Sequence, residues 1–262
     1  MKLDKFLVQS QIGTRKIVRS HIKDGFIKVN GVVCFEPTCE INEKDDIVEY
    51  NGEIIKYRDK VYYMFNKPAG CITARKDHIE KTVFEYFKDV NTDGVFHVGR
   101  LDKDTEGVLL FTNDGDFNNK LMSPKFHVEK KYFFIALGNI DEKSKKLLEN
   151  GVSIGKDEPI TKPARIEDLK NGTYSELEKE FNLRKYYDIN SECYVQPIVY
   201  GYLTISEGRK HQIKRMLKSI GCYVIYLNRV SIGNLNMDEA LKKGEYRSLT
   251  EDEIKSFNNL DY

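Results

Sequence analysis

The chain has 262 residues, 40% of them hydrophobic, which is enough for one or two folded domains with their own cores. Lys and Arg number 42 against 41 Asp and Glu, so any nucleic-acid binding must come from local patches of charge rather than from the net charge of +1. The five cysteines form no C-x-x-C pair and no apolar run has the length of a membrane span. These features argue against a disulfide or zinc framework and against a membrane protein, so we expect a cytoplasmic protein with reduced thiols.

Two short amphipathic helices are predicted at the start of the chain. Leu3, Phe6 and Leu7 share one helical face, and a second helix is predicted between Thr14, a plausible N-cap, and Gly25. The apolar arc of the second helix comprises Ile17, Val18, His21 and Ile22. A separate, basic arc comprises Arg15, Lys16, Arg19 and Lys23. One face can therefore pack against a core while the other meets phosphates, although a solvated basic face is the common alternative.

A β-hairpin follows these helices. Residues 27–29 and 32–33 are predicted strands, and Asn30-Gly31 between them is a strong signal for a two-residue turn. The chain then becomes acidic, and residues 46–50 are predicted to add one more strand. We expect residues 51–59 to be a linker, which would let this first module move independently of the rest of the chain.

The second part of the chain is predicted to open with a strand and a tight turn. Residues 61–65 are apolar and aromatic, and Pro68 and Gly70 force a turn directly after them. Lys67 in this turn could meet a phosphate or could be an ordinary solvated lysine, and the sequence favours neither. Residues 81–87 are predicted to form a helix.

A heavily charged loop, residues 99–107, lies between two apolar runs that are predicted to be buried strands, 95–98 and 108–111. The loop carries one Arg, one Lys and three carboxylates. Arg100 and Lys103 beside Asp102 would keep its carboxylate charged and oriented near the protein interior. Taken alone, the same pattern also fits a solvated turn with a local ion pair.

The middle of the chain alternates between predicted helices and strands. Residues 113–116 form a turn into a helix, and residues 129–136 read as a strand. Residues 141–151 are predicted to be a helix and residues 161–167 a further strand. The inward-facing positions of the helix at 141–151 are expected to be Leu147 and Leu148.

The last third of the chain contains a predicted amphipathic helix with a lysine beside its apolar stripe. After a polar segment at 171–197 and a strand at 201–205, an apolar stripe repeats with helical spacing and comprises Ile213, Met216, Leu217 and Ile220. Lys214 lies beside this stripe, so its side chain can reach along the edge of the interior to a carboxylate. A surface lysine is the alternative. Residues 224–227 are a further predicted strand.

The charged loop reads G-R-L-D-x-D-T-x-G and resembles the catalytic motif of RNA pseudouridine synthases, in the RsuA branch. The resemblance continues to about Ile254 in the order of the family. Its motifs are K-P-x-G at 67–70, K-x-Y at 130–132, T-K-P-A at 161–164, N-R-V-S-I-G at 228–233 and G-E-Y-R-S-L-T at 244–250. The first thirty or so residues also resemble the S4 RNA-binding domain.

The resemblance implies an α+β fold in two parts. An S4 RNA-binding module with its linker would span residues 1–58, and a pseudouridine synthase catalytic domain would span 59–262. The catalytic domain is expected to have a mixed, mainly antiparallel sheet flanked by helices. The segment 171–197 then reads as an insertion, in which we expect local packing for Tyr186, Tyr187 and Tyr194.

Three catalytic residues are implied by matching motif positions. Asp102 corresponds to the catalytic aspartate, and Lys214 corresponds to the basic residue that forms a salt bridge with it. Tyr132 corresponds to the tyrosine that stacks against the target base, where an aromatic ring would support the base while it is detached and turned.

The resemblance also implies residues that bind the substrate. Ile232 is expected to lie under the uracil, and Arg100 could fill the gap that the flipped uridine leaves. Lys130 and Arg209 are expected to lie along the RNA backbone. His211 would suggest a general base if it were considered alone, but the resemblance assigns it no such role.

The implied function is isomerisation of uridine to pseudouridine in 16S rRNA, at the uridine modified by the type member, position 516. This reaction moves no hydride, electron or phosphate, so we expect no cofactor and no metal. The expected partner is ribosomal RNA or a small-subunit assembly particle, and we expect a monomer. One alternative is a 23S rRNA pseudouridine synthase of the RluB or RluF type. Another is a non-catalytic S4-type RNA-binding factor in ribosome assembly, which would not need Asp102.

Overall fold

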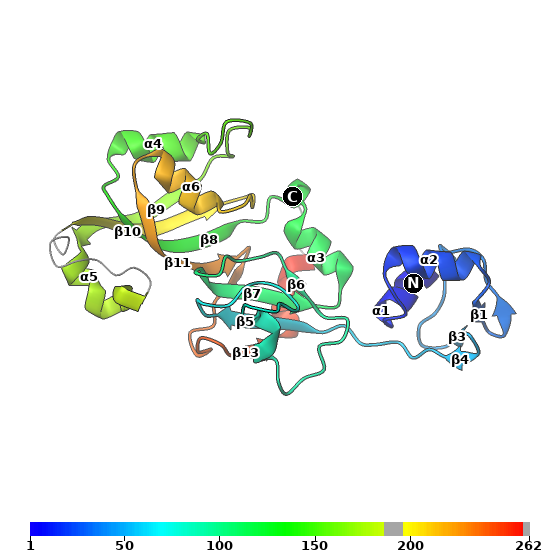
Figure 1. Ribbon diagram of the computed structural model, residues 1–262. Helices are drawn as coiled ribbons and strands as arrows, with labels where there is room; N and C mark the ends of the chain where they lie inside the picture. Colours follow the sequence, from blue (N-terminus) through cyan, green and yellow to red (C-terminus); the bar gives the residue numbers. More distant parts are fainter. Residues whose placement is uncertain (186–195, 259–262) are drawn as a thin grey trace.

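The computed structural model describes residues 1–185 and 196–258. The strands of these residues form two sheets, a four-stranded sheet near the N-terminus and a nine-stranded sheet in the rest of the chain. The first unit lies beside the main body, and an extended segment joins the two (Figure 1). In the described ranges, no helix has both the length and the apolar character that a membrane crossing requires.

The N-terminal unit packs two helices against its small sheet. Its elements are α1 (Leu3–Gln9), α2 (Arg15–Lys23), β1 (Ile27–Val29), β2 (Val32–Val33), β3 (Val48–Tyr50) and β4 (Glu53–Ile54). The predicted cap is confirmed, since the Thr14 hydroxyl accepts a hydrogen bond from the Ile17 backbone N–H at 3.4 Å. The predicted hairpin is confirmed as well, with positive φ angles of 52° at Asn30 and 81° at Gly31.

Two details of the N-terminal prediction are wrong. Ile17 was placed on the apolar arc of α2, but its side chain is 46% exposed, and only Val18 and Ile22 of that helix are fully buried. The predicted linker at 51–59 begins too early, because Asn51 and Gly52 form a second turn with positive φ that pairs β4 with β3. The connecting segment therefore starts after β4.

The main sheet has the strand order β13-β5-β7-β11-β8-β10-β9, with β6 paired to β7 and β12 to β11. Among the described residues, β7 and β11 are parallel and every other strand pair of this sheet is antiparallel. This confirms the predicted mixed, mainly antiparallel sheet. The strands are β5 (Tyr62–Lys67), β6 (Phe96–Val98), β7 (Glu106–Thr112), β8 (Lys130–Leu137), β9 (Arg165–Thr173), β10 (Pro197–Ile205), β11 (Tyr223–Ile232), β12 (Leu235–Asn236) and β13 (Tyr246–Ser248).

Helices cover both faces of this sheet, which is why every residue of β7 is buried. Leu109 and Phe111 of β7 join the core under α4 and α6, whereas Val108 and Leu110 join the core under α3 and α7. A third cluster lies under α5, the helix at the far end of the sheet in Figure 1. These helices are α3 (Gly115–Met122), α4 (Glu142–Asn150), α5 (Tyr174–Phe181), α6 (Gln212–Ser219) and α7 (Glu251–Asn258).

Several predicted elements differ in extent from the structure. The predicted helix at 81–87 is a single 3-10 turn, Val83–Tyr86. Leu148 of α4 is buried as predicted, but Leu147 is 48% exposed. The strand predicted at 161–167 begins at Arg165 and continues to Thr173, because β10 pairs with it along that length.

The segment predicted as an insertion, 171–197, contains the end of β9, the helix α5 and the start of β10. Its helix α5 spans Tyr174–Phe181 and is followed by a 3-10 turn, Leu183–Lys185. Tyr186, Tyr187 and Tyr194 lie outside the described residues.

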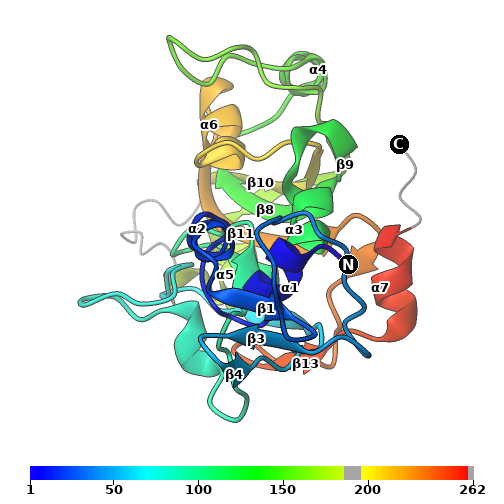
Figure 2. The same cartoon turned by 90° about the vertical axis from the view of Figure 1, so that its right-hand side faces the viewer.

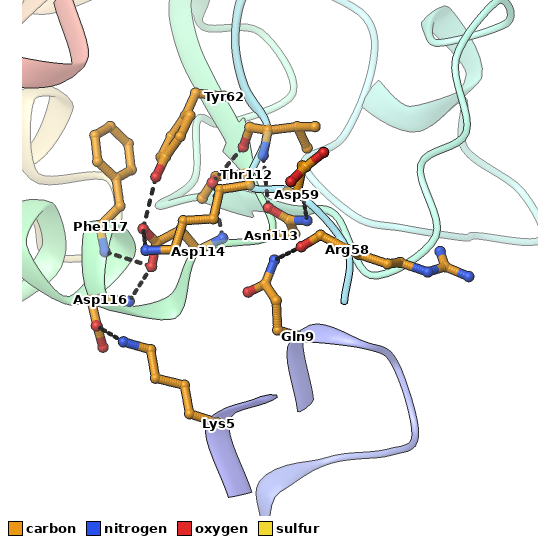
Figure 3. Close-up of polar contacts among 12 residues, drawn as sticks. Lys5, Gln9, Arg58, Asp59, Tyr62, Thr112, Asn113, Asp114, Asp116 and Phe117 are labelled. Carbon is orange, nitrogen blue, oxygen red and sulfur yellow. Dashed lines mark hydrogen bonds and ion pairs between the residues drawn. The ribbon is translucent and has the colours of Figure 1, made fainter. Parts of the chain in front are cut away.

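The helix α1 faces the start of α3 and so links the two units (Figures 2 and 3). Lys5 of α1 forms an ion pair with Asp116 of α3. Gln9 Nε2 donates to the backbone carbonyl of Arg58 at 3.3 Å, and the ring of Tyr57 stacks on Phe6 with centroids 5.8 Å apart. The connecting segment is thus held against α1 by polar and aromatic contacts.

Asp114 joins the connecting segment to α3 (Figure 3). Its carboxylate caps α3 by accepting from the backbone N–H of Asp116 at 3.0 Å, and it also accepts from Lys60 at 2.7 Å and from the Tyr62 hydroxyl at 2.8 Å. Burial alone would raise the pKa of Asp114, but the hydrogen bonds from Lys60 and Tyr62 outweigh burial and lower it.

We expect Asp114→Asn to lower the free energy of unfolding by about 2 kcal/mol at pH 7, because the ion pair with Lys60 is lost from a buried site while asparagine keeps the cap. The lowered pKa of Asp114 stabilises the fold above about pH 4, and this contribution disappears as the pH falls through that pKa. The difference between wild type and variant should therefore shrink in acid. Urea unfolding between pH 3 and 7 measures it.

The matched control is Asp141→Asn, because Asp141 caps α4 at the surface through the Ser144 N–H and receives no such buried ion pair. It should change stability by less than about 0.5 kcal/mol. Equal losses in the two variants would contradict the role of Lys60 and Tyr62.

Candidate active site

A cavity of about 600 Å³ lies where the charged loop meets the start of α6. Its floor is formed by side chains from neighbouring strands of the main sheet, with Arg229 of β11 opposite Tyr132 of β8 and Ile205 of β10 opposite Lys130. Residues 99–102 and Thr105 form one wall, and residues 208–214 form the other. The two motifs that sequence analysis singled out therefore face each other across one cavity.

The wall that carries Asp102 is fixed by hydrogen bonds to its main chain. Thr73 donates through its hydroxyl to the carbonyl of Leu101 at 2.7 Å and accepts from the Leu101 N–H at 3.1 Å. The N–H of Thr105 donates to the carbonyl of Asp102 at 3.2 Å. The carboxylate is thus presented by a held loop, and its side chain is 30% exposed.

Lys67 fixes the same loop from below, and neither interpretation offered for it from the sequence is correct. Its side chain is fully buried, and its ammonium donates to the carbonyls of Thr105 at 2.9 Å, Pro68 at 3.1 Å and Lys103 at 3.3 Å. Burial lowers the pKa of Lys67. It is neither a phosphate ligand nor a solvated loop residue, but a connection between the K-P-x-G turn and the charged loop.

Asp102 faces a lysine and a histidine of the opposite wall. Its carboxylate lies 3.7 Å from Lys214 Nζ and 3.5 Å from His211 Nε2. The predicted neighbour Lys214 is thus within ion-pair distance, but its closest contacts are with Asp104, at 2.5 and 2.6 Å. Two of the three carboxylates of the loop, Asp102 and Asp104, therefore share one lysine.

Of the two basic residues of the loop, only Arg100 lines the cavity. Lys103, expected to hold Asp102, instead forms an ion pair with Glu80 at 2.6 Å. Its side chain therefore points away from the cavity. Arg100 is exposed and lines the cavity, as a residue that fills a vacated base position would have to be.

Tyr132 lines the cavity, but Ile232 does not. The Tyr132 side chain is 9% exposed on the cavity floor. Ile232 is 2% exposed and belongs to the core under α3 and α7, beyond a register shift between Arg229 and Ser231. Ile232 is therefore not among the residues that line the cavity, where it was expected to lie under the uracil. The apolar residues that do line the cavity include Ile205, Ile213 and Leu227.

Two residues that were expected to contact the RNA backbone have charged groups that bind other groups of the protein. Lys130 is buried and donates to the carbonyl of Val128 at 2.8 Å, and burial together with the charge of Arg229 lowers its pKa to about 8. Arg209 binds Glu207 at 3.1 Å and the carbonyl of Ile160 at 3.1 Å. Both belong to the cavity lining, but their charged groups have protein partners.

Three residues of the basic face of α2 are exposed and form no ion pair with a buried carboxylate of the described chain. They are Arg15, Lys16 and Lys23. Arg19 differs because its guanidinium pairs with the buried Asp4 at 2.8 Å. His21, which the sequence places on the apolar arc, has its Nδ1 3.1 Å from the Tyr50 hydroxyl. The charged arc is therefore exposed at α2, but Arg19 is partly used to stabilise the unit.

Sequence reasoning assigned no role to several residues around the cavity. Thr105 and Arg229 both lie within motifs that were quoted, yet only the structure shows that they line the cavity. His211 was set aside, although its ring lies near Asp102. Their position inside a family motif, as basic or polar residues without an assigned role, could have marked them as candidate site residues.

Comparison with known proteins agrees with this geometry. A family model described as RNA pseudouridylate synthase matches residues 61–219. The chain is 36% identical to an uncharacterized RNA pseudouridine synthase of Bacillus subtilis over 98% of each chain. It is 33% identical to ribosomal small subunit pseudouridine synthase A of Haemophilus influenzae, over 97% of this chain and 98% of the relative.

Two further matches have similar coverage. Ribosomal large subunit pseudouridine synthase B of Bacillus subtilis is 34% identical, over 99% of this chain and 96% of the relative. A crystal structure of a pseudouridylate synthase aligns with a TM-score of 0.64 and 30% identity, over 98% of this chain and 99% of that one.

The chain therefore belongs to the RNA pseudouridine synthases, a family of isomerases. Within that family it is of the RsuA type, as the full-length similarity to small-subunit synthases and the motif order indicate.

Proposed function

We propose that this enzyme converts uridine to pseudouridine in 16S rRNA, at the uridine 516 class of site, with Asp102 as the catalytic residue. The observation that carries the proposal is the position of Asp102, on a fixed loop at the mouth of a cavity whose floor carries Tyr132. A cation lies 3.7 Å away at Lys214. One placed carboxylate, one cation and an aromatic surface are what the reaction needs.

The isomerisation balances without any added reactant. The N1–C1′ bond breaks, the base turns, and a C5–C1′ bond forms while C5 loses a proton and N1 gains one. Asp102 would either bond to C1′ or take a proton from the sugar, and both routes use the same carboxylate. Tyr132 would support the base while it is detached.

The choice of 16S rRNA rests on the motif T-K-P-A, residues 161–164, which resembles the small-subunit enzyme. Overall identity does not favour it, because the small-subunit relative at 33% and the large-subunit relative at 34% are equally similar. A 23S rRNA synthase is therefore the alternative within the family. A purely RNA-binding assembly factor is disfavoured, because binding alone gives no reason to hold a carboxylate at a cavity mouth.

The test is to incubate the protein with 16S and 23S transcripts and with precursor particles of both subunits, and to map pseudouridine in each. We expect a single modified uridine in 16S rRNA. Product only in 23S rRNA would replace the proposed substrate, and no product in any of the four would overturn the enzymatic proposal.

We also propose that residues 1–58 form an S4-type RNA-binding module that docks the catalytic domain, residues 59–262, on its RNA. The exposed basic face of α2 and the small separate core of this unit support the proposal. Salt dependence is the expected signature, since phosphate contacts release counterions.

We expect the triple variant R15A/K16A/K23A to weaken RNA binding uniformly across sequences and to lower the salt slope by roughly 1 per residue. Arg19 is left in place because its loss would leave the buried Asp4 carboxylate unpaired. Filter binding from 50 to 300 mM salt measures the slope. The control is Lys44→Ala, an exposed lysine of the acidic loop in the same unit, and an equal effect of that control would contradict the assignment of α2.

A further inference from the structure

Two buried polar atoms on the lining of the cavity lack a hydrogen-bond partner among the described residues. They are Nη2 of Arg229 and Oγ1 of Thr105. Arg229 is 4% exposed and Thr105 is 2% exposed. An unmatched buried donor or acceptor costs about 1–3 kcal/mol, and more when it is charged. Because both residues line the cavity, a ligand bound there is a candidate partner for these two atoms.

Arg229 is held in place by the atom next to the unmatched one. Its Nε donates to the carbonyl of Val108 at 2.8 Å, and its guanidinium carbon lies 6.0 Å from the ring centroid of Tyr132. In the described part of the chain no carboxylate pairs with this guanidinium. The charge of Arg229 lowers the pKa of a second basic residue of the cavity lining, Lys130. A buried arginine in this setting favours an oxygen acceptor from the substrate.

Thr105 ends the charged loop directly before β7, and Arg229 belongs to β11, the strand beside β7. Arg229 lies directly opposite Gly107 in the parallel pair of β7 and β11, and Thr105 is two residues before Gly107. Tyr132 lies opposite Arg229 on its other side, in β8. A base that stacks on Tyr132 would thus lie beside the guanidinium, with Thr105 in the lining of the same cavity.

The edge of uracil presents a carbonyl oxygen, an N3–H and a second carbonyl oxygen. A guanidinium N–H can donate to either oxygen, and a threonine hydroxyl can accept from N3–H. Cytosine presents a bare N3 and an amino group instead, so the same pair of protein groups would fit it poorly. If cytosine were bound, these buried polar groups of the protein would be left without hydrogen bonds. Such a penalty discriminates strongly between two bases of similar size.

We propose that Arg229 and Thr105 bind the edge of the target uracil, with Arg229 Nη2 donating to a ring carbonyl and Thr105 Oγ1 accepting from N3–H. This inference rests on the proposed function and assigns its specificity for uracil. When the N1–C1′ bond breaks, its electron pair stays on the base and spreads to the ring oxygens, while Asp102 bonds to C1′ or takes a sugar proton. The guanidinium therefore also stabilises the detached base, so Arg229 should act on kcat.

The first test compares Arg229→Met and Thr105→Val with wild type in single-turnover reactions on the rRNA transcript that wild type modifies. We expect the rate to fall about 100-fold for Arg229→Met and about 10-fold for Thr105→Val, with RNA affinity unchanged. The Tm should not fall in Arg229→Met, because the unmatched charge leaves the interior. Arg165→Met, a surface arginine paired with Glu129, is the control and should keep full activity.

A merely structural role for Arg229 predicts the opposite pattern. In that case the Tm and the RNA affinity would fall together in Arg229→Met, and Arg229→Lys would restore the Tm. Either that result or a full rate in both variants would overturn the inference.

The second test changes the base instead of the protein. Transcripts carry 3-deazauridine, 2-thiouridine or 4-thiouridine at the target position, and each is combined with each variant. 3-Deazauridine should slow wild type about 10-fold but Thr105→Val hardly at all, since the N3–H partner is already missing. One of the two thio analogues should slow wild type but hardly slow Arg229→Met. The position of its sulfur then identifies the ring oxygen that Arg229 binds.

Equal slowing of wild type and variants by every analogue would overturn this inference and leave the proposed function intact. If wild type forms no pseudouridine from unmodified transcripts or particles, the proposed function fails and this inference fails with it.

Discussion

Asp102→Asn is expected to abolish pseudouridine formation, with a rate at least ~10⁴-fold below wild type, while RNA affinity changes less than about two-fold. The amide can neither bond to C1′ nor take a proton from the sugar. The fold should be unaffected, because the hydrogen bond that orders this loop uses the main-chain carbonyl of Asp102 and its side chain is 30% exposed. Single-turnover kinetics and filter binding on the same transcript measure both quantities.

The matched control is Asp104→Asn, two residues further along the same loop. Asp104 holds Lys214 at 2.5 Å, so its loss removes the closest partner of that lysine and leaves Asp102 as its remaining carboxylate neighbour in the described chain. We expect Asp104→Asn to retain most of its activity, within about 10-fold of wild type. Loss of RNA binding in Asp102→Asn, or equal loss of activity in the two variants, would contradict the assignment of Asp102.

Much of the fold could be predicted because its signals are local. The turn at Asn30-Gly31 needs positive φ at both residues, and Asn-Gly supplies it within two positions. The cap at Thr14 and the stripe Ile213, Met216 and Leu217 likewise depend on neighbours within one or two helical turns. The placement of Asp102 between two buried strands follows from the same kind of evidence.

The errors concern residues whose surroundings come from distant parts of the chain. From the sequence, Lys67 in a Lys-Pro turn is expected to be exposed. It is instead buried, because its ammonium donates hydrogen bonds to the carbonyls of Lys103 and Thr105, 36 and 38 residues away in sequence. Lys130 is buried as well, and its ammonium donates hydrogen bonds to the carbonyls of Leu121 and Val128, at and after the end of α3. Periodicity and charge along the sequence contain no information about such carbonyl partners.

Ile232 illustrates a different failure. A motif gives the order of residues, but which face of a strand each residue occupies depends on register. The shift between Arg229 and Ser231 separates Ile232 from the cavity residues of β11, so that Leu227 and Arg229 line the cavity and Ile232 joins another core. The strand predicted at 224–227 covers only the first part of β11, so it could not assign Ile232 to a face of the sheet.

Gly107→Ala is expected to lower the free energy of unfolding by about 4 kcal/mol and to abolish activity at temperatures where the wild type works. Gly107 has a φ of 101°, and a Cβ there would lie 2.2 Å from the backbone oxygen of Arg229 and 2.2 Å from Asn228 Oδ1. Alanine would therefore force β7 away from β11, the parallel strands that carry Thr105 and Arg229 to the cavity. Urea unfolding of the purified variant measures the loss.

Gly115→Ala provides the control, since Gly115 opens α3 with nothing within 4 Å of an added Cβ and without a positive φ. It should be neutral or should stabilise the protein by up to about 1 kcal/mol. The last glycine of the G-R-L-D-x-D-T-x-G motif is thus explained by the close approach of two strands, not by the flexibility of a loop. If Gly107→Ala were as stable as Gly115→Ala, the strands would not need that approach, and the register that places Arg229 beside Tyr132 would lose its support.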